Sequence, residues 1–313
     1  MVILSHGRAS REDGTTLSVV GPNAPAGQIA EALTSSSDSD LIYVAVRDAV
    51  SITVSTSLDG GATWETVPAP DVSGKQAIAD VAVAKVGDRM TILLDEASST
   101  AISSGTVATA ASPGASWVMR SAPVGGTLSA AGGRFWISGG VMGDQVFTSS
   151  DGTTWRAAKL PILKRYWTAA AATDVDRVGV VIPVTSHDPG GPSEITLLAT
   201  TDVGRTWRVA ASVAAPPTEI DTTIPVSITG DGHWFAVWPD GSKVVAGLLG
   251  AKGQTTISPN GLPANVSEIA FTSATSGVAV SGVADCPNGK SSCTSRSVVT
   301  RTSDGGQDWT PVP

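Results

Sequence analysis

The sequence predicts an all-β fold, a propeller of four-stranded blades, from three observations: its composition, a recurring motif and the spacing of that motif. The 313 residues include 34 Gly and 19 Pro but only 15% charged residues, which is typical of short strands joined by many turns. A hydrophobic content of 41% is enough for a large core and excludes a disordered chain. The net charge of −8 argues against nucleic-acid binding, and no apolar run is long enough to span a membrane.

The motif is a short segment that recurs along the chain and ends in tryptophan. It reads Ser-Leu-Asp-Gly-Gly-Ala-Thr-Trp at 57–64, and variants follow at 149–155, 200–207 and 302–309. A degenerate copy at 112–117 keeps the spacing but has Ser in place of the acid. The complete copies contribute Asp59, Trp64, Asp151, Trp155, Asp202, Trp207, Asp304 and Trp309.

Each copy of the motif predicts a turn between two strands. An aspartate side chain can accept hydrogen bonds from the backbone amides of its own turn, and glycine adopts the positive φ that a Cβ disfavours. The tryptophan then begins the next strand and buries its ring beneath the hairpin. We therefore interpret these aspartates as structural, rather than catalytic or calcium-binding.

The spacing of the motif predicts the number of blades. The acids or their equivalents fall at positions 59, 112, 151, 202 and 304. The last interval, 102 residues, is twice the interval of 51 before it, so one copy has decayed near 251–254. This gives six repeats of about 40–50 residues, the size of a four-stranded blade. Strand-like runs fill the repeats in order, and helical periodicity is nowhere sustained.

The motif, Ser/Thr-x-Asp-x-Gly-x-Thr-Trp, resembles that of the Asp-box family, also called bacterial neuraminidase repeats. The copies cover nearly the whole chain. The resemblance implies that each box joins the third and fourth strands of a blade, and that a ligand site lies on the opposite face at the channel mouth. The family includes sialidases, other glycoside hydrolases, sorting receptors and a photosystem assembly factor, so the resemblance indicates fold better than function.

Two segments define the expected domain organisation. Residues 28–313 are expected to form a single propeller domain. Residues 1–27 contain a further degenerate motif at 13–17 and either complete a seventh blade or supplement the closure of a six-bladed ring. We expect six blades.

Three acids in the predicted innermost strands are the candidate catalytic residues: Glu31, Asp80 and Glu268. An alignment of these strands places the acids in one column, so we expect them to point toward the axis from adjacent blades. Like charges that converge raise one another's pKa or recruit a cation. The cluster is consistent with a carboxylate pair for glycoside hydrolysis, a calcium site, or a hydrated polar lining of the channel.

Loops on the same predicted face supply candidate ligand-binding residues. The segment 164–167 offers cations and a stacking surface for a sugar or peptide, and Asp95 and Glu96 add charge nearby. The residues that we single out for ligand binding are Arg47, Asp48, Arg165, Tyr166, Trp167, His187, Asp188 and Asp221. Each loop charge could equally be a solvated surface residue, and Trp167 could belong to the core.

True sialidase activity is not expected. The Arg-Ile-Pro motif that the resemblance would require is missing, since residues 25–29 read Pro-Ala-Gly-Gln-Ile. The chain has only two tyrosines, Tyr43 and Tyr166, and an acidic site has the wrong sign for an anionic sugar. We therefore expect a propeller that binds a glycan, peptide or protein partner, with a non-sialidase glycoside hydrolase as the alternative.

The two cysteines, Cys286 and Cys293, are interpreted as a disulfide that staples a loop. A zinc site would require further ligands, and the sequence has neither a second Cys pair nor a local His cluster. A disulfide indicates an oxidising compartment, so we expect a secreted, cell-surface or periplasmic protein whose signal segment lies outside this sequence. No cofactor is required, and calcium at the channel mouth is the cation that the acids would suit.

Overall fold

A computed structural model describes the backbone of residues 2–312, apart from 6–7, 13–16, 20–27, 36–39, 48–50, 74–76, 97–104, 141, 162–165, 189–190, 218–223 and 286–293. Side chains are described from residue 40 onward, without these segments and without 283–285 and 294–296. The described part of the chain consists of strands and turns and contains no helix. In particular, it has no helix that could cross a membrane.

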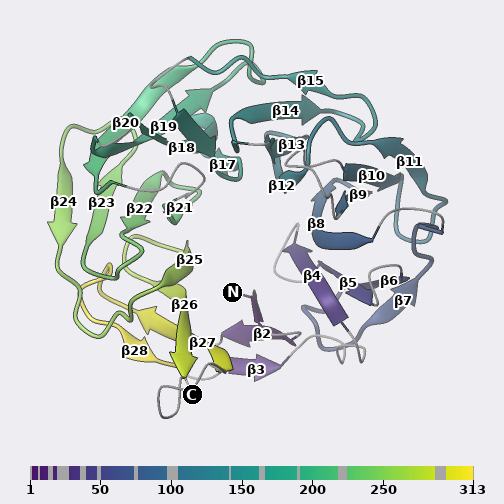
Figure 1. The fold of residues 1–313 in the computed structure, drawn as a ribbon, viewed down its shortest axis with the longest axis horizontal. Coiled ribbons are helices and arrows are strands. Elements are labelled where there is room, and N and C mark those ends of the chain that lie inside the picture. Colours follow the sequence, from purple (N-terminus) through teal and green to yellow (C-terminus); the bar gives the residue numbers. More distant parts are fainter. Residues whose placement is uncertain are drawn as a thin grey trace.

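Six antiparallel blades follow one another along the chain and form a ring around a central axis (Figure 1). The first two comprise β4 (Gln28–Ser35), β5 (Leu41–Arg47), β6 (Ser51–Ser57) and β7 (Glu65–Val67), then β8 (Ile78–Val86), β9 (Arg89–Glu96), β10 (Gly105–Ala110) and β11 (Val118–Ser121). The third comprises β12 (Gly126–Ala131), β13 (Arg134–Gly139), β14 (Gln145–Ser149) and β15 (Arg156–Ala157). The predicted six-bladed, all-β propeller is confirmed.

The other three blades have the same order, with one irregularity. The fourth comprises β16 (Tyr166–Ala169), β17 (Thr173–Val175), β18 (Gly179–His187), β19 (Ser193–Thr200) and β20 (Arg208–Ala215), and its innermost position is shared by β16 and β17. The fifth comprises β21 (Val226–Ile228), β22 (His233–Val237), β23 (Val244–Leu248) and β24 (Gln254–Ile257). The sixth comprises β25 (Val266–Phe271), β26 (Gly277–Asp285), β27 (Thr294–Thr302) and β28 (Thr310–Pro311).

A separate three-stranded sheet precedes the blades. It comprises β1 (Val2–Ser5), β2 (Arg8–Glu12) and β3 (Leu17–Val19), paired in that order. In the view of Figure 1 it lies between the sixth and the first blades. Most of the degenerate motif at 13–17, namely residues 13–16, lies outside the described residues.

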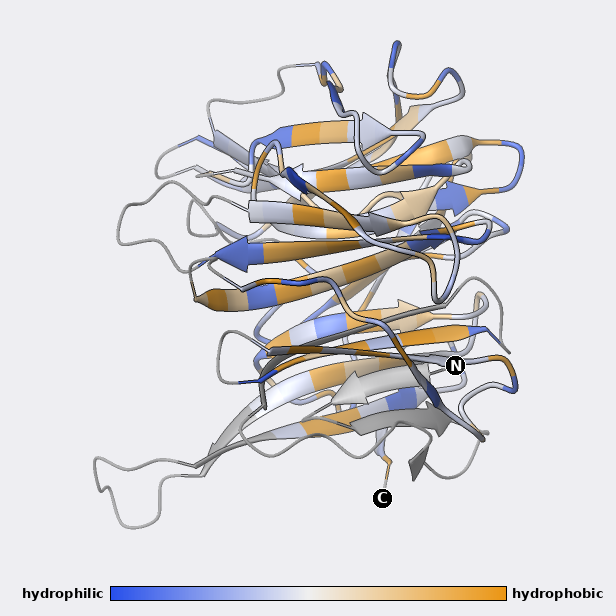
Figure 2. Ribbon diagram, turned by 90° about the vertical axis from the view of Figure 1, so that its right-hand side faces the viewer, coloured by the Kyte–Doolittle hydropathy of each residue, from blue (hydrophilic) through white to orange (hydrophobic). Residues whose placement is uncertain are grey.

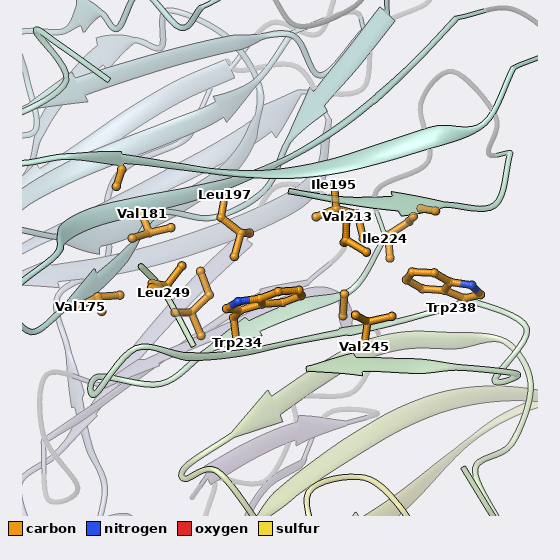
Figure 3. Packing of buried hydrophobic residues seen from close by; sticks show 14 residues of the cluster. Val175, Val181, Ile195, Leu197, Val213, Ile224, Trp234, Trp238, Val245 and Leu249 are labelled. Carbon is orange, nitrogen blue, oxygen red and sulfur yellow. The ribbon is translucent and has the colours of Figure 1, made fainter. Parts of the chain in front are cut away.

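Apolar side chains pack in layers between neighbouring blades, and hydrophobic bands run across the stacked strands in Figure 2. Figure 3 shows the layer between the fourth and fifth blades, where Val181 and Leu197 face Trp234 and Val245. Burying a large apolar side chain contributes about 1.5–3 kcal/mol each. Alternate side chains of a strand point to opposite faces of its blade, so each blade contributes apolar side chains to the interfaces with both neighbouring blades. These interfaces form the core of the molecule.

The motif turns have the hydrogen bonds that the sequence predicts. Asp59 accepts the Thr63 N–H at 2.9 Å and the Thr63 hydroxyl at 2.6 Å, while Ser57 Oγ accepts the Gly61 N–H at 2.8 Å. Equivalent bonds bind the turns at 149–155, 200–207 and 302–309. All of these turns join the third and fourth strands of a blade, and the decayed copy at 251–254 is at the same position, where it leads from the end of β23 into the first residue of β24.

One turn departs from the others in its backbone. Val203 has a φ of 63°, where the turns of the first and sixth blades place Gly60 and Gly305 at 71° and 77°. A β-branched residue in this left-handed region is strained. The Val203 carbonyl accepts a hydrogen bond from Arg156 Nη2 at 3.0 Å, which ties the third blade to the fourth.

Candidate functional site

The innermost strands of four consecutive blades surround a cavity of about 360 Å³, which we call the mouth cavity. Its lining consists of Thr127, Ala169, Ala170, Ala171, Thr173, Ile224, Pro225, Val226, Ser267, Glu268 and Ile269. Most of these residues lie where the innermost strands of blades three, five and six begin. The motif turns lie at the other end of those strands, so the cavity is on the face opposite the turns.

A break in the innermost strand of the fourth blade forms part of the cavity wall. Ala170 donates its N–H to the Pro183 carbonyl at 2.9 Å, so the inner edge of β18 faces this segment at Pro183. Because proline has no N–H, Pro183 cannot donate a hydrogen bond to this segment, and the ladder is interrupted between β16 and β17. The interrupted segment instead binds the third blade: Ser138 Oγ donates to the Ala170 carbonyl and Ala172 N–H donates to Ser129 Oγ, both at 3.0 Å.

Glu268 is the one charged side chain among the described residues that line the cavity. It projects from β25 and is accessible within the cavity. Burial by the surrounding protein nevertheless raises the pKa of its carboxyl group. A carboxylate here is incompletely solvated, and no ion pair to it is formed by the described residues. It is therefore available to a ligand that carries positive charge or hydrogen-bond donors.

A second acidic feature lies at the same end of the second blade. Asp80 in β8 and Asp95 in β9 are directly opposite each other in the ladder. Burial, together with the charge of Asp80, raises the pKa of Asp95 to about 6, against the effect of a hydrogen bond from the Gly126 N–H at 3.2 Å. Opposed residues of this kind have Cβ atoms about 4.5–5.5 Å apart, so ionising both carboxyl groups is unfavourable.

Gly126 connects the acid pair with the mouth cavity. Its φ of 140° is in the range that favours glycine, and a Cβ there would lie 2.3 Å from the Ser138 carbonyl oxygen. Only glycine therefore brings this amide of the third blade within reach of Asp95. The next residue, Thr127, lines the cavity, so the acid pair borders the cavity wall.

The candidate catalytic acids are placed as follows. Asp80 and Glu268 lie in β8 and β25, while Glu31 lies in β4 opposite Ala45, and its side chain is outside the described residues. Asp80 shares its side of β8 with Ala82 and Ala84, which pack against the third blade. By this alternation its side chain is directed toward the gap between blades two and three, rather than straight along the axis as the alignment suggests.

Asp95 was expected to be a loop charge and is not among the candidate site residues that the sequence predicts. Asp95 is instead part of β9 and only half-buried. The sequence feature that indicates this pairing is the short Gly87–Asp88 turn between β8 and β9, which fixes the register of the two strands. Counting outward from that two-residue turn, from Val86 opposite Arg89, places Asp95 opposite Asp80.

The aromatic candidates come together away from the cavity lining. The rings of Tyr166 and His187 stack with centroids 5.8 Å apart, and Trp167 packs against the core between the third and fourth blades. Tyr43, the other tyrosine, is buried in β5. Neither tyrosine lines the mouth cavity.

The remaining candidates are dispersed or not described. Arg47 ends β5 and Asp188 follows β18, and both side chains are exposed. The others, Asp48, Arg165, Asp221, Cys286 and Cys293, lie outside the described residues. The last described pair of the β26–β27 ladder, Asp285 and Thr294, immediately flanks the two cysteines, and their disulfide stays a prediction. Among the described residues, no group of three or more His, Cys, Asp or Glu side chains is positioned to hold a metal ion.

No protein-family model and no curated protein matches the chain. Its fold is similar to that of YCF48 from Cyanidioschyzon merolae, with 14% identity and a TM-score of 0.52 over 92% of this chain and 86% of that one. A streptogramin B lyase is similar with 13% identity and a TM-score of 0.51, covering 94% of both chains. An α-L-arabinofuranosidase from Fusarium graminearum is similar with 13% identity and a TM-score of 0.50, over 88% and 93% respectively. At such identities the likeness establishes the fold, a β-propeller.

Proposed function

We propose that this protein is a binding propeller that takes up a polypeptide segment at the mouth cavity. The observation that carries the proposal is the composition of the cavity. Its described lining combines small aliphatic side chains, three hydroxyls and one carboxylate, and includes no aromatic ring. A sugar ring would be expected to find an aromatic stacking surface, whereas aliphatic walls suit a side chain.

The backbone around the cavity also favours a peptide. The strands β12, β21 and β25 each end their sheet, so each pairs on one side only. Strand edges of this kind present N–H and C=O groups that can bind the main chain of an extended peptide. A cavity of about 360 Å³ then accommodates one of its side chains.

The experiment is a selection from a library of random peptides displayed on phage, with two variants as filters. Thr127→Trp fills the cavity from an accessible strand position, and Thr255→Trp makes the same change in β24, at the outer edge of the fifth blade. We expect selected peptides to lose binding to Thr127→Trp and retain it to Thr255→Trp. Failure to select any peptide, or equal binding to both variants, would contradict the proposal.

A second candidate function, glycoside hydrolysis, is favoured by the Asp80–Asp95 pair. Asp95, with a pKa of about 6, keeps its proton at mildly acidic pH, where an ordinary aspartate has lost it, as a general acid requires. Such enzymes place two carboxyl groups on either side of the bond, roughly 5–9.5 Å apart. Asp80 and Asp95 are neighbours on one blade, so Glu268 or Glu31 would have to supply the opposite group.

Hydrolysis is tested separately with a panel of aryl glycosides at pH 5 to 7. Turnover that is lost in both Asp95→Asn and Glu268→Gln would establish this second function. Turnover that persists in both variants, or no turnover with the panel, would leave binding as the function of the site.

A further inference from the structure

We propose that the peptide bound in the mouth cavity inserts a lysine side chain, whose ammonium group pairs with the Glu268 carboxylate. This inference rests on the proposed function and specifies its ligand. It follows from three properties of the described lining: its single charge, its aliphatic walls and its hydroxyl groups.

The single negative charge of the described lining favours a ligand with one positive charge. Glu268 is the sole charged residue in the described lining, and that lining contains no Lys or Arg. A carboxylate that is partly desolvated gains from a partner of opposite sign, because the pair interacts in a medium of lower dielectric than bulk water. A neutral hydrogen-bond donor would solvate this carboxylate but would leave its charge unpaired.

The walls favour an unbranched aliphatic stem beneath the cation. Ala169–Ala171, Ile224, Val226 and Ile269 surround the cavity with methyl and methylene groups. A lysine side chain buries four methylene groups along such a surface while its ammonium reaches a polar partner. An N-terminal ammonium lacks this stem, so the shape matches a side chain better than a chain end.

The hydroxyl groups distinguish lysine from arginine. An ammonium group has three donors, of which one can bind the carboxylate while the others bind Thr127, Thr173 or Ser267 hydroxyls in the lining. A guanidinium group prefers a carboxylate approached in its own plane and an aromatic face on which to stack. The described lining has no aromatic face, so arginine is the poorer fit.

The test compares short peptides of the form acetyl-Ala-Ala-X-Ala-Ala-amide, with lysine, arginine or norleucine at X, together with n-butylamine as a free alkylamine. Binding to the purified protein is measured by calorimetry at neutral pH. We expect the lysine peptide to bind at least about tenfold more tightly than the norleucine peptide, and more tightly than the arginine peptide or n-butylamine.

Two variants and one titration identify Glu268 as the partner. Glu268→Gln should abolish the preference for lysine over norleucine, whereas Glu65→Gln, which changes an exposed acid of β7, should preserve it. Melting temperatures confirm that both variants are folded. In the unaltered protein, the preference should disappear on acidification, when Glu268 becomes protonated.

The outcomes separate this inference from the proposed function. Equal binding of the lysine and norleucine peptides, lost in Thr127→Trp, would overturn the lysine assignment and leave the peptide site intact. Binding of n-butylamine as tight as that of the lysine peptide would assign the cavity to a free alkylamine and overturn both. A lysine preference that persists in Glu268→Gln would overturn the role of Glu268.

Discussion

The two faces of the propeller place the same kind of side chain in opposite electrostatic environments. In the motif turns, hydrogen bonds from the Thr63 and Thr206 hydroxyls and amides lower the pKa of Asp59 and Asp202 to about 2. At the mouth, burial and a like charge raise the pKa of Asp95 to about 6. An aspartate whose charge is fully used by its own turn is structural, whereas one whose charge is poorly compensated is available to a ligand.

The largest expected change in stability comes from removing a tryptophan of the motif turns. Trp309 is 3% exposed, donates from Nε1 to the Gly306 carbonyl at 3.0 Å and packs edge-on against Phe271. Trp309→Ala should lower the free energy of unfolding by about 3–5 kcal/mol, measured by urea denaturation. Peptide binding by the fraction that remains folded should be unchanged. A variant of unaltered stability that no longer binds would place function on the turn face.

The next effect concerns a turn aspartate and its dependence on pH. Asp202→Ala removes the acceptor of the Thr206 and Arg205 amides and should lower the melting temperature at neutral pH. Because the pKa of Asp202 is lowered to about 2, these bonds stabilise the fold above about pH 4 and are lost as the pH falls through 2. The melting temperatures of variant and parent should therefore converge on acidification. A constant difference down to pH 2 would contradict the assigned cause.

A change at the mouth should have the opposite sign. The pKa of Asp95 is raised from 3.8 to about 6, so the native protein holds this proton more tightly than the unfolded chain. Stability therefore falls as the pH rises from about 4 to 6, and Asp95→Asn should remove that loss. Allowing for solvent screening, we expect a gain of about 1 kcal/mol at pH 7 and none at pH 4.

The control for this prediction is Asp174→Asn, which alters an exposed aspartate of β17. It should leave the unfolding free energy unchanged at both pH values. A loss of stability in Asp95→Asn at pH 7 would mean that the acid is favourably solvated, and the contrast between the two faces would fail.

The smallest expected change in stability concerns the backbone strain in one motif turn compared with the others. Val203 has a positive φ that the glycine-containing turns adopt without strain. Val203→Gly should raise the unfolding free energy by up to about 1 kcal/mol, because relief of strain exceeds the added flexibility of the unfolded chain. Val209→Gly, at an exposed position of β20, should be destabilising. Destabilisation by both substitutions would show that the turn is not strained.

The features that sequence predicts here are the local ones. Asp59 and Thr63 are four residues apart, so their bond can be inferred from the motif, and regular spacing then supplies the number of blades. The Asp80–Asp95 pair joins two strands, and it emerges only when the Gly87–Asp88 turn fixes their register. The mouth cavity is lined by residues from four blades. These residues are far apart in the sequence, so no short sequence pattern predicts that Thr127, Ala170, Ile224 and Glu268 surround one space.

Pro183 indicates how the inner edge of a propeller blade can be interrupted. One missing N–H on the second strand of a blade prevents the innermost strand from pairing continuously, and the unpaired segment lines the mouth cavity. One proline on a second strand can therefore interrupt the pairing at the inner edge of its blade. In a fold whose repeats are otherwise alike, a proline introduced at the matching position of another blade is the simplest way to engineer a second interruption.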